Sequence, residues 1–62
     1  MLYKNMFYKN KKIKHSVFGN GIVIDVIGRK GQSTLLYVKF ENDDKEYRKF
    51  TTKSILPFIV EE

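Results

Sequence analysis

The sequence predicts an all-β domain in which five short strands close into a small barrel. Apolar and β-branched residues form short runs that are separated by turns rich in glycine, asparagine and aspartate. No run has the length and periodicity of an ordinary helix. The 62-residue chain also contains no cysteine, so neither a disulfide nor a thiolate zinc site can stabilise the fold. Closed packing of strands must then supply the stability of so small a domain.

The positive charge belongs to one end of the chain. The formal net charge is +5, yet residues 1–15 contain five lysines and no acid, while residues 16–62 contain seven basic and seven acidic side chains. We therefore predict a basic, aromatic-rich N-terminal arm at residues 1–10 and a barrel at residues 11–62. Lysines interrupt the apolar residues of the arm, and no stretch approaches the roughly 18 apolar residues of a membrane span. The sequence thus predicts a cytoplasmic protein with no membrane partner.

The first strand is expected at residues 11–14, where the flanking lysines suit an edge strand and Ile13 is the buried residue. A tight turn is expected at residues 19–21, which read Gly-Asn-Gly. Glycine and asparagine tolerate positive φ, so the chain can reverse there at little steric cost.

A second strand is expected at residues 22–27, which are β-branched except for Asp25. Simple alternation buries Ile22, Ile24 and Val26. A one-residue bulge beside glycine would instead exchange the two faces part-way along the strand. Both arrangements fit the sequence.

A polar loop at residues 28–33 leads into a third strand at residues 34–40. Alternation places Tyr37 and Lys39 on its outer face. The expected core residues of this strand are Leu36, Val38 and Phe40.

The remaining residues predict a turn at 41–45, a strand at 46–50, a single helical turn at 51–54 and a last strand at 55–60. Pro57 confines that last strand to an edge or an end, because proline cannot donate a ladder hydrogen bond. Five short strands joined by tight turns fit an SH3-like or Tudor-like barrel. An OB-fold fits less well, since it needs more residues.

One motif strengthens this prediction. The segment His15-x-x-Phe18-Gly19-x-Gly21-x-Val23 is followed by Val38-Lys39-Phe40, Arg48-Lys49-Phe50 and Ile55-Leu56-Pro57-Phe58. Over residues 13–58 this pattern resembles the Tudor-like (SH3-like) C-terminal domain of UvrD-type superfamily-1 DNA helicases. The resemblance implies an interaction module, which in those helicases is linked to RNA polymerase binding and DNA repair. The sequence carries no helicase motor, so helicase activity is not implied.

The resemblance also implies roles for individual residues. Gly19 and Gly21 form the turn, and His15 enters it. The implied core residues are Phe18, Val23, Val38, Phe40 and Phe50.

No group of residues predicts catalysis, a cofactor or a metal, so we expect a protein that is not an enzyme. His15 is the only histidine, and its imidazole is expected to bond a backbone group beside the turn. The glycines at 19–21 lack the Lys-Ser or Lys-Thr of a phosphate-binding loop. The adjacent carboxylates Asp43 and Asp44 are expected to cap a turn rather than to bind a cation.

Two outer tyrosines, Tyr37 and Tyr47, are the candidate partner-binding residues, with Lys39, Arg29 and Lys30 around them. Exposed aromatic rings on neighbouring strands can stack on a base, a methylated cation or a peptide. We expect a protein partner from DNA or RNA metabolism, and the resemblance implies RNA polymerase. Ordinary cross-strand pairing is the structural alternative for the same tyrosines.

Direct binding of DNA or RNA is the second hypothesis. In this hypothesis lysines of the arm and first strand contact phosphates while a tyrosine stacks on a base. The candidate nucleic-acid-binding residues are Lys9, Lys11, Lys12 and Lys14. Lysine-rich segments also occur as solvated tails that bind nothing, which is the alternative for this arm.

Overall fold

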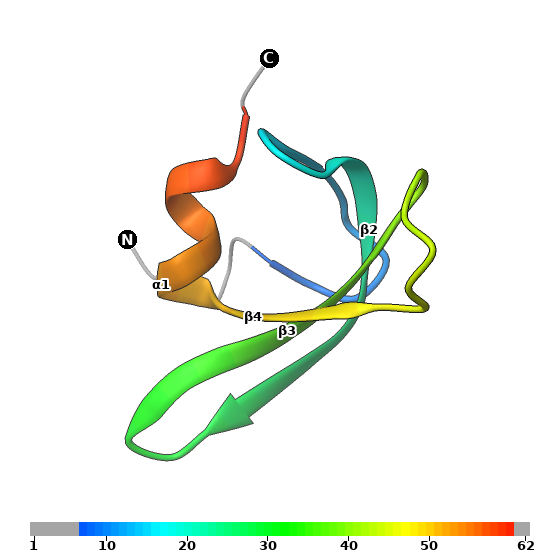
Figure 1. Ribbon diagram of the computed structural model, residues 1–62. Coiled ribbons are helices and arrows are strands. Elements are labelled where there is room, and N and C mark those ends of the chain that lie inside the picture. The colour runs from blue at the N-terminus through cyan, green and yellow to red at the C-terminus, as the bar shows by residue number, and fades with distance from the viewer. Residues whose placement is uncertain (1–6, 61–62) are drawn as a thin grey trace.

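The computed structural model describes residues 7–60 and shows a mostly β protein built on one antiparallel four-stranded sheet. The strand order in the sheet is the chain order, β1-β2-β3-β4 (Figure 1). The strands are β1 (Lys12–His15), β2 (Gly19–Arg29), β3 (Gln32–Phe40) and β4 (Arg48–Thr51). They are followed by α1 (Thr52–Ile55) and a 3-10 helix, η2 (Leu56–Phe58).

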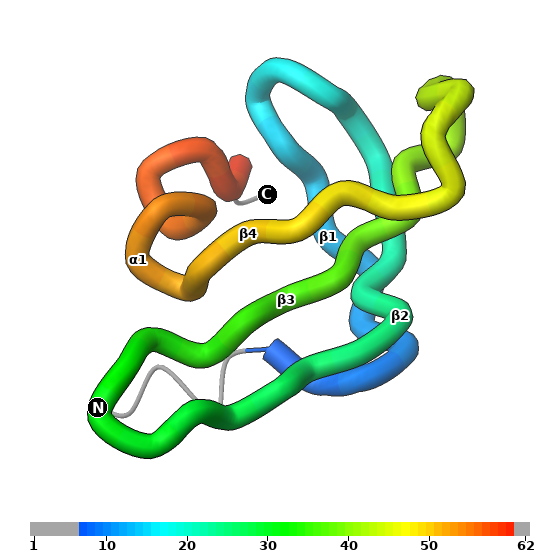
Figure 2. Tube along the Cα trace, turned by 60° about the horizontal axis from the view of Figure 1, so that its bottom comes forward, coloured from blue at the N-terminus to red at the C-terminus, as the bar shows by residue number. Residues whose placement is uncertain are grey.

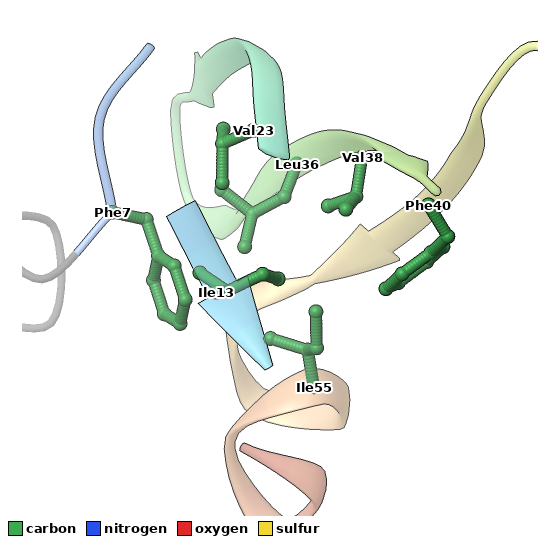
Figure 3. Close-up of a cluster of buried hydrophobic side chains, with 7 residues drawn as sticks. All are labelled: Phe7, Ile13, Val23, Leu36, Val38, Phe40 and Ile55. Carbon is green, nitrogen blue, oxygen red and sulfur yellow. The ribbon is translucent and has the colours of Figure 1, made fainter. Parts of the chain in front are cut away.

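The inner face of the sheet carries the apolar core (Figure 3). The predicted inner residues of β3 are confirmed, because Leu36, Val38 and Phe40 are fully buried. Val23 from β2 and Ile55 from α1 are also fully buried against them. Removing these side chains from water is the main source of stability for the domain.

The reversal between β1 and β2 lies at residues 16–18, so the prediction of a turn at 19–21 is wrong. Gly19 already pairs with His15 in the ladder, and its φ of 83° guides the chain out of the turn into β2. Gly21 lies within β2 against Phe40, where a Cβ atom would come within 2.6 Å of that ring. The second glycine therefore permits a close approach rather than a turn.

A register shift in β2 between Val23 and Asp25 decides which residues of that strand are buried. Val23 is fully buried, while Ile22 and Ile24 are only half-buried, so the prediction from simple alternation is wrong for those two. Beyond the shift Val26 packs against the core. A bulge lets one strand change the residues that it turns inward, as the alternative interpretation required.

The β2–β3 hairpin projects beyond the rest of the sheet (Figures 1 and 2). The loop predicted at 28–33 is shorter in the structure. Arg29 pairs directly with Gln32, so only Lys30 and Gly31 form the turn. Gly31 has a φ of 71°, which suits a tight hairpin turn. The two strands therefore extend almost to the tip.

The segment after β3 differs in part from the prediction. β4 begins at Arg48 rather than residue 46, and Tyr47 lies in the preceding loop. The predicted helical turn is confirmed as α1, where the Thr51 and Ser54 side chains form a capping box.

The predicted last strand at 55–60 is wrong. Ile55 ends α1, and the following residues form η2 with a proline in its first turn. Only Ile59 forms a bridge, to His15 of β1. Hydrogen bonds from the Ser16 N–H to the Phe58 carbonyl and from the Val60 N–H to the Lys14 carbonyl fix this contact. The fifth strand is thus reduced to a single bridge, because a proline and the helical turn before it interrupt the extended backbone.

Residues 7–10, from the predicted arm, pack on the sheet, whereas residues 1–6 of that arm lie outside the described residues. Phe7 is only 5% exposed and belongs to the core cluster (Figure 3). The Asn10 N–H donates to the Val23 carbonyl, and the Val23 N–H donates to the Lys11 carbonyl. These contacts make Phe7 an integral part of the fold.

Candidate functional site

The outer face of the sheet brings together residues from both predicted sites. Lys12 of β1 pairs with Ile22 of β2, which pairs with Lys39 of β3, so the three form one row across the sheet. Tyr37 lies two residues before Lys39 on the same face and pairs with Lys49 of β4. We call these five residues together with Tyr47 the outer-face site.

The tyrosines of this site touch each other. The ring centroids of Tyr37 and Tyr47 lie 5.2 Å apart with an interplanar angle of 46°. Tyr47 is 44% exposed and Tyr37 is half-buried beneath it. The two tyrosines are thus neighbours, although Tyr47 lies in the loop and not in a strand. Their role in binding a partner stays a prediction.

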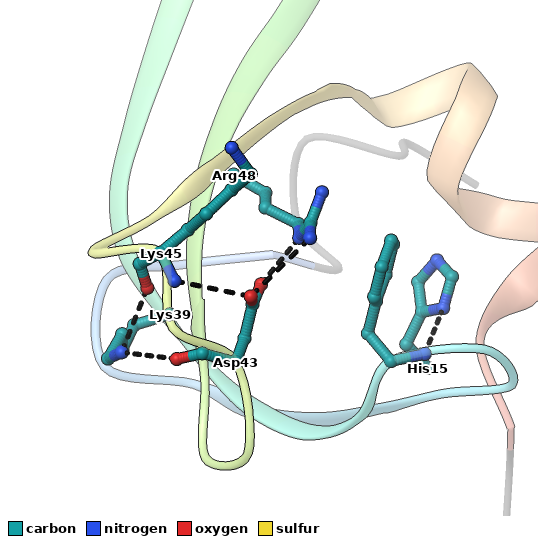
Figure 4. Close-up of polar contacts among 6 residues, drawn as sticks. His15, Lys39, Asp43, Lys45 and Arg48 are labelled. Carbon is teal, nitrogen blue, oxygen red and sulfur yellow. Dashed lines mark hydrogen bonds and ion pairs between the residues drawn. The ribbon is translucent and has the colours of Figure 1, made fainter.

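The loop between β3 and β4 is held by Asp43 and Lys39 (Figure 4). The Lys39 Nζ donates to the backbone carbonyls of Asp43 at 3.1 Å and Lys45 at 2.9 Å. The Asp43 carboxylate accepts from the Arg48 guanidinium and from the Lys45 N–H. These hydrogen bonds, with that from Arg48 the largest cause, lower the pKa of Asp43. Asp43 therefore organises the loop that carries Tyr47, in line with its expected capping role.

Arg29 and Lys30 do not reach the outer-face tyrosines. The Arg29 guanidinium donates twice to the Ser33 carbonyl, at 3.0 and 2.8 Å, and so stiffens the hairpin tip. Tyr37 lies five positions along β3 from Gln32, the pairing partner of Arg29, which corresponds to about 17 Å. These two predicted contacts lie at the other end of the projecting hairpin.

The lysines of the predicted nucleic-acid site divide into two groups. Lys12 and Lys14 are exposed on β1, and Lys12 belongs to the outer-face site. Lys9 is exposed in the turn before β1. The Lys11 ammonium instead lies over aromatic rings, 5.6 Å from the Phe7 centroid and 5.4 Å from that of Tyr8.

The second notable site is an aromatic pocket of about 360 Å³, lined by His15, Val17, Phe18, Phe50, Ser54 and Phe58. The His15 ring stacks on Phe58 with centroids 5.1 Å apart and lies 4.9 Å from the Phe18 centroid. Two residues of the pocket lining, Val17 and Phe58, are exposed to solvent. No pattern in the sequence predicts this pocket, because its residues come from β1, the following turn, β4, α1 and η2.

His15 holds the turn beside this pocket, as expected. Its Nδ1 accepts hydrogen bonds from the N–H groups of Val17 at 3.0 Å and Phe18 at 3.2 Å. Figure 4 shows His15 with one of these hydrogen bonds. An accepting Nδ1 requires the neutral ring with its proton on Nε2. Burial lowers the pKa of His15, which favours that neutral form.

Within residues 7–60, no group of three or more histidine, cysteine or acidic side chains could hold a metal ion. The same part of the chain contains no helix long and apolar enough to cross a membrane. Comparison with protein-family models, with curated proteins and with solved structures finds no match to this chain. The function must therefore be argued from the outer-face site itself.

Proposed function

We propose that this protein is a non-enzymatic interaction module that binds an acidic protein partner of DNA or RNA metabolism through the outer-face site. The observation that carries the proposal is the contact between Tyr37 and the exposed Tyr47 beside exposed lysines. Exposed aromatic side chains on an ordered surface are the residues that most often dominate protein interfaces. RNA polymerase is the partner to examine first, because the Tudor-like resemblance implies it.

The barrel belongs to the same proposal. The four-stranded sheet and the bridge between His15 and Ile59 support an SH3-like, Tudor-like barrel whose last strand is very short. This arrangement leaves the outer face free to bind while the inner face forms the core.

The apolar content of the face favours protein over nucleic acid. Ile22 lies at the centre of the lysine row, and Ile27, which pairs with Leu35, is 39% exposed farther along the sheet. Asp25 pairs with Tyr37 and brings a negative charge close to the rings, so an acidic residue of the partner fits beside the lysines and not at the tyrosines. A phosphate backbone gains little from such groups, whereas a protein segment can bury the apolar side chains.

Nucleic-acid binding is the second candidate, because Lys12 and Lys14 are exposed on one strand beside the outer-face site. Salt separates the two candidates. Four or five lysine–phosphate contacts would lose roughly two orders of magnitude in affinity between about 50 and 200 mM salt, through counterion release. A protein interface centred on tyrosines would weaken much less over that range.

The experiment measures binding of the purified full chain to purified RNA polymerase and to a single-stranded oligonucleotide at both salt concentrations. We expect nuclease-resistant binding to the polymerase, weakened at least about tenfold by Tyr47→Ala, as for an aromatic residue at the centre of an interface. Tyr8→Ala is the matched control, since Tyr8 is 58% exposed outside the site. Equal effects of the two substitutions, or binding to the oligonucleotide alone, would contradict the proposal.

A further inference from the structure

A groove of about 460 Å³ lies over β1, β2 and the end of β3, with Lys39 of its lining two residues from Tyr37. Its lining includes Lys12, Asn20, Ile22, Lys39 and Glu41. Lys12, Ile22 and Lys39 form one row by register, and Asn20 and Glu41 are joined by a backbone hydrogen bond at the neighbouring position. The groove thus presents two cations, one amide and one carboxylate around an isoleucine.

The two cations lie on either side of Ile22. Paired residues on adjacent antiparallel strands are about 5 Å apart, so a group above Ile22 is within reach of both lysine side chains. The Lys39 ammonium has three N–H donors, and it donates to the carbonyls of Asp43 and Lys45 in the β3–β4 loop. The Lys39 side chain also lines the groove. Lys12 is exposed and adjustable. Two ammonium groups can bind a carboxylate by charge-assisted hydrogen bonds.

The spacing between Lys39 in the groove and Tyr37 matches the spacing of side chains along an extended peptide. Lys39 and Tyr37 are two residues apart on β3, which corresponds to about 6.7 Å along the strand. Side chains at positions i and i+2 of an extended peptide project on one face with this same spacing.

We infer that the groove receives an aspartate or glutamate of an extended partner segment whose aromatic or aliphatic residue, two positions away, packs on Tyr37 and Tyr47. The inference rests on the proposed function and specifies its partner: a protein segment with an acidic and an apolar residue separated by one position. Glu41, on one wall of the groove, opposes the bound carboxylate, so its removal strengthens binding.

The probe is a fluorescein-labelled peptide with two Glu-Ser-Phe repeats, measured by anisotropy with the full chain at about 0.1 M salt, where the screening length is about 10 Å. Lys12→Gln should weaken binding about two- to fivefold, the range for an exposed charge pair. Glu41→Gln should tighten it by a similar factor. Lys30→Gln, which removes the same charge at the hairpin tip, should change it by less than about 1.5-fold because salt screens distant charges.

Peptides carrying two Gln-Ser-Phe repeats lack the charge, and peptides carrying two Glu-Phe-Ser-Ser repeats lack the spacing of two positions in either direction. Both are expected to bind more weakly. The inference is overturned if Lys12→Gln and Lys30→Gln weaken peptide binding equally, or if Glu41→Gln leaves peptide binding unchanged. It is also overturned if Lys12→Gln weakens binding of a single-stranded oligonucleotide but not of the peptide. Should Tyr47→Ala still reduce polymerase binding in that case, the proposed function stands and only the groove assignment falls. Failure of the polymerase to bind at all would instead remove the proposed function.

Discussion

At the scale of single residues, His15 shows how one side chain can serve the fold and link it to pH. Its Nδ1 accepts two backbone N–H groups, and its ring packs against Phe18 and Phe58. Protonation of Nδ1 would remove both hydrogen bonds and place a charge among apolar rings. The folded protein therefore favours the neutral histidine.

The lowered pKa of His15 predicts acid-sensitive stability. The unfolded chain takes up a proton near the ordinary value of 6.5, while the folded chain resists protonation until a lower pH. The free energy of unfolding should be highest above that value and fall as the pH drops below it. Urea unfolding at about pH 7.5 and about pH 5 measures the difference.

His15→Asn is the control for this prediction, because asparagine can accept a backbone N–H two residues ahead and does not titrate. We expect this variant to be less stable at neutral pH, since it lacks the ring contacts, and to show a smaller loss between the two pH values. A loss equal to that of the wild type would show that His15 is not the titrating group.

Gly21 provides a prediction about packing. An alanine Cβ there would lie 2.6 Å from the Phe40 ring and 3.0 Å from the Lys39 carbonyl. Gly21→Ala should lower the free energy of unfolding by about 1–3 kcal/mol, as for an overpacked core. At Gly28 no atom lies within 4 Å of an added Cβ, so Gly28→Ala should leave stability unchanged or raise it by up to about 1 kcal/mol. Thermal unfolding of both variants checks the contrast, and similar effects would contradict it.

At the scale of elements, the sequence predicts the presence of the first four strands, while several of their first and last residues differ in the structure. The alternation of Leu36, Val38 and Phe40 located the core of β3 because nothing interrupts its period of two. The bulge after Val23 depends on pairing with β3, so alternation within β2 alone could not reveal it. The C-terminal segment is apolar enough for a strand, but the capping box and Pro57 turn it into two short helices.

The segment before β1 contributes to the stability of the domain. Charge alone suggested an arm separate from the domain, yet Phe7 is buried in the core. Phe7→Ala should cost about 3–5 kcal/mol, as for a truncated core aromatic. Tyr8→Ala should cost less than about 1 kcal/mol, because Tyr8 is exposed. Chemical denaturation of the two variants measures this, and equal costs would show that Phe7 is not part of the core.

At the scale of the whole molecule, the sheet combines two hypotheses that appeared separate along the chain. Lys12 is a predicted nucleic-acid contact, while Tyr37, Lys39 and Tyr47 are predicted protein contacts. The register places Lys12, Lys39 and Tyr37 on one face, and the ring contact with Tyr37 brings Tyr47 to it. Arg29 and Lys30 were grouped with the tyrosines because they are close in sequence, and the length of the hairpin separates them. The aromatic pocket escaped prediction because only the tertiary fold assembles it.

The outer-face site is the central claim, and amide chemical shifts test it most directly. The isotope-labelled full chain would be titrated with the peptide that carries Glu-Ser-Phe repeats. We predict that shifts concentrate at Lys12, Ile22, Tyr37, Lys39 and Lys49, with little change at the hairpin tip or in the aromatic pocket. Shifts concentrated at Val17, Ser54 and Phe58 would assign binding to the aromatic pocket and contradict the claim.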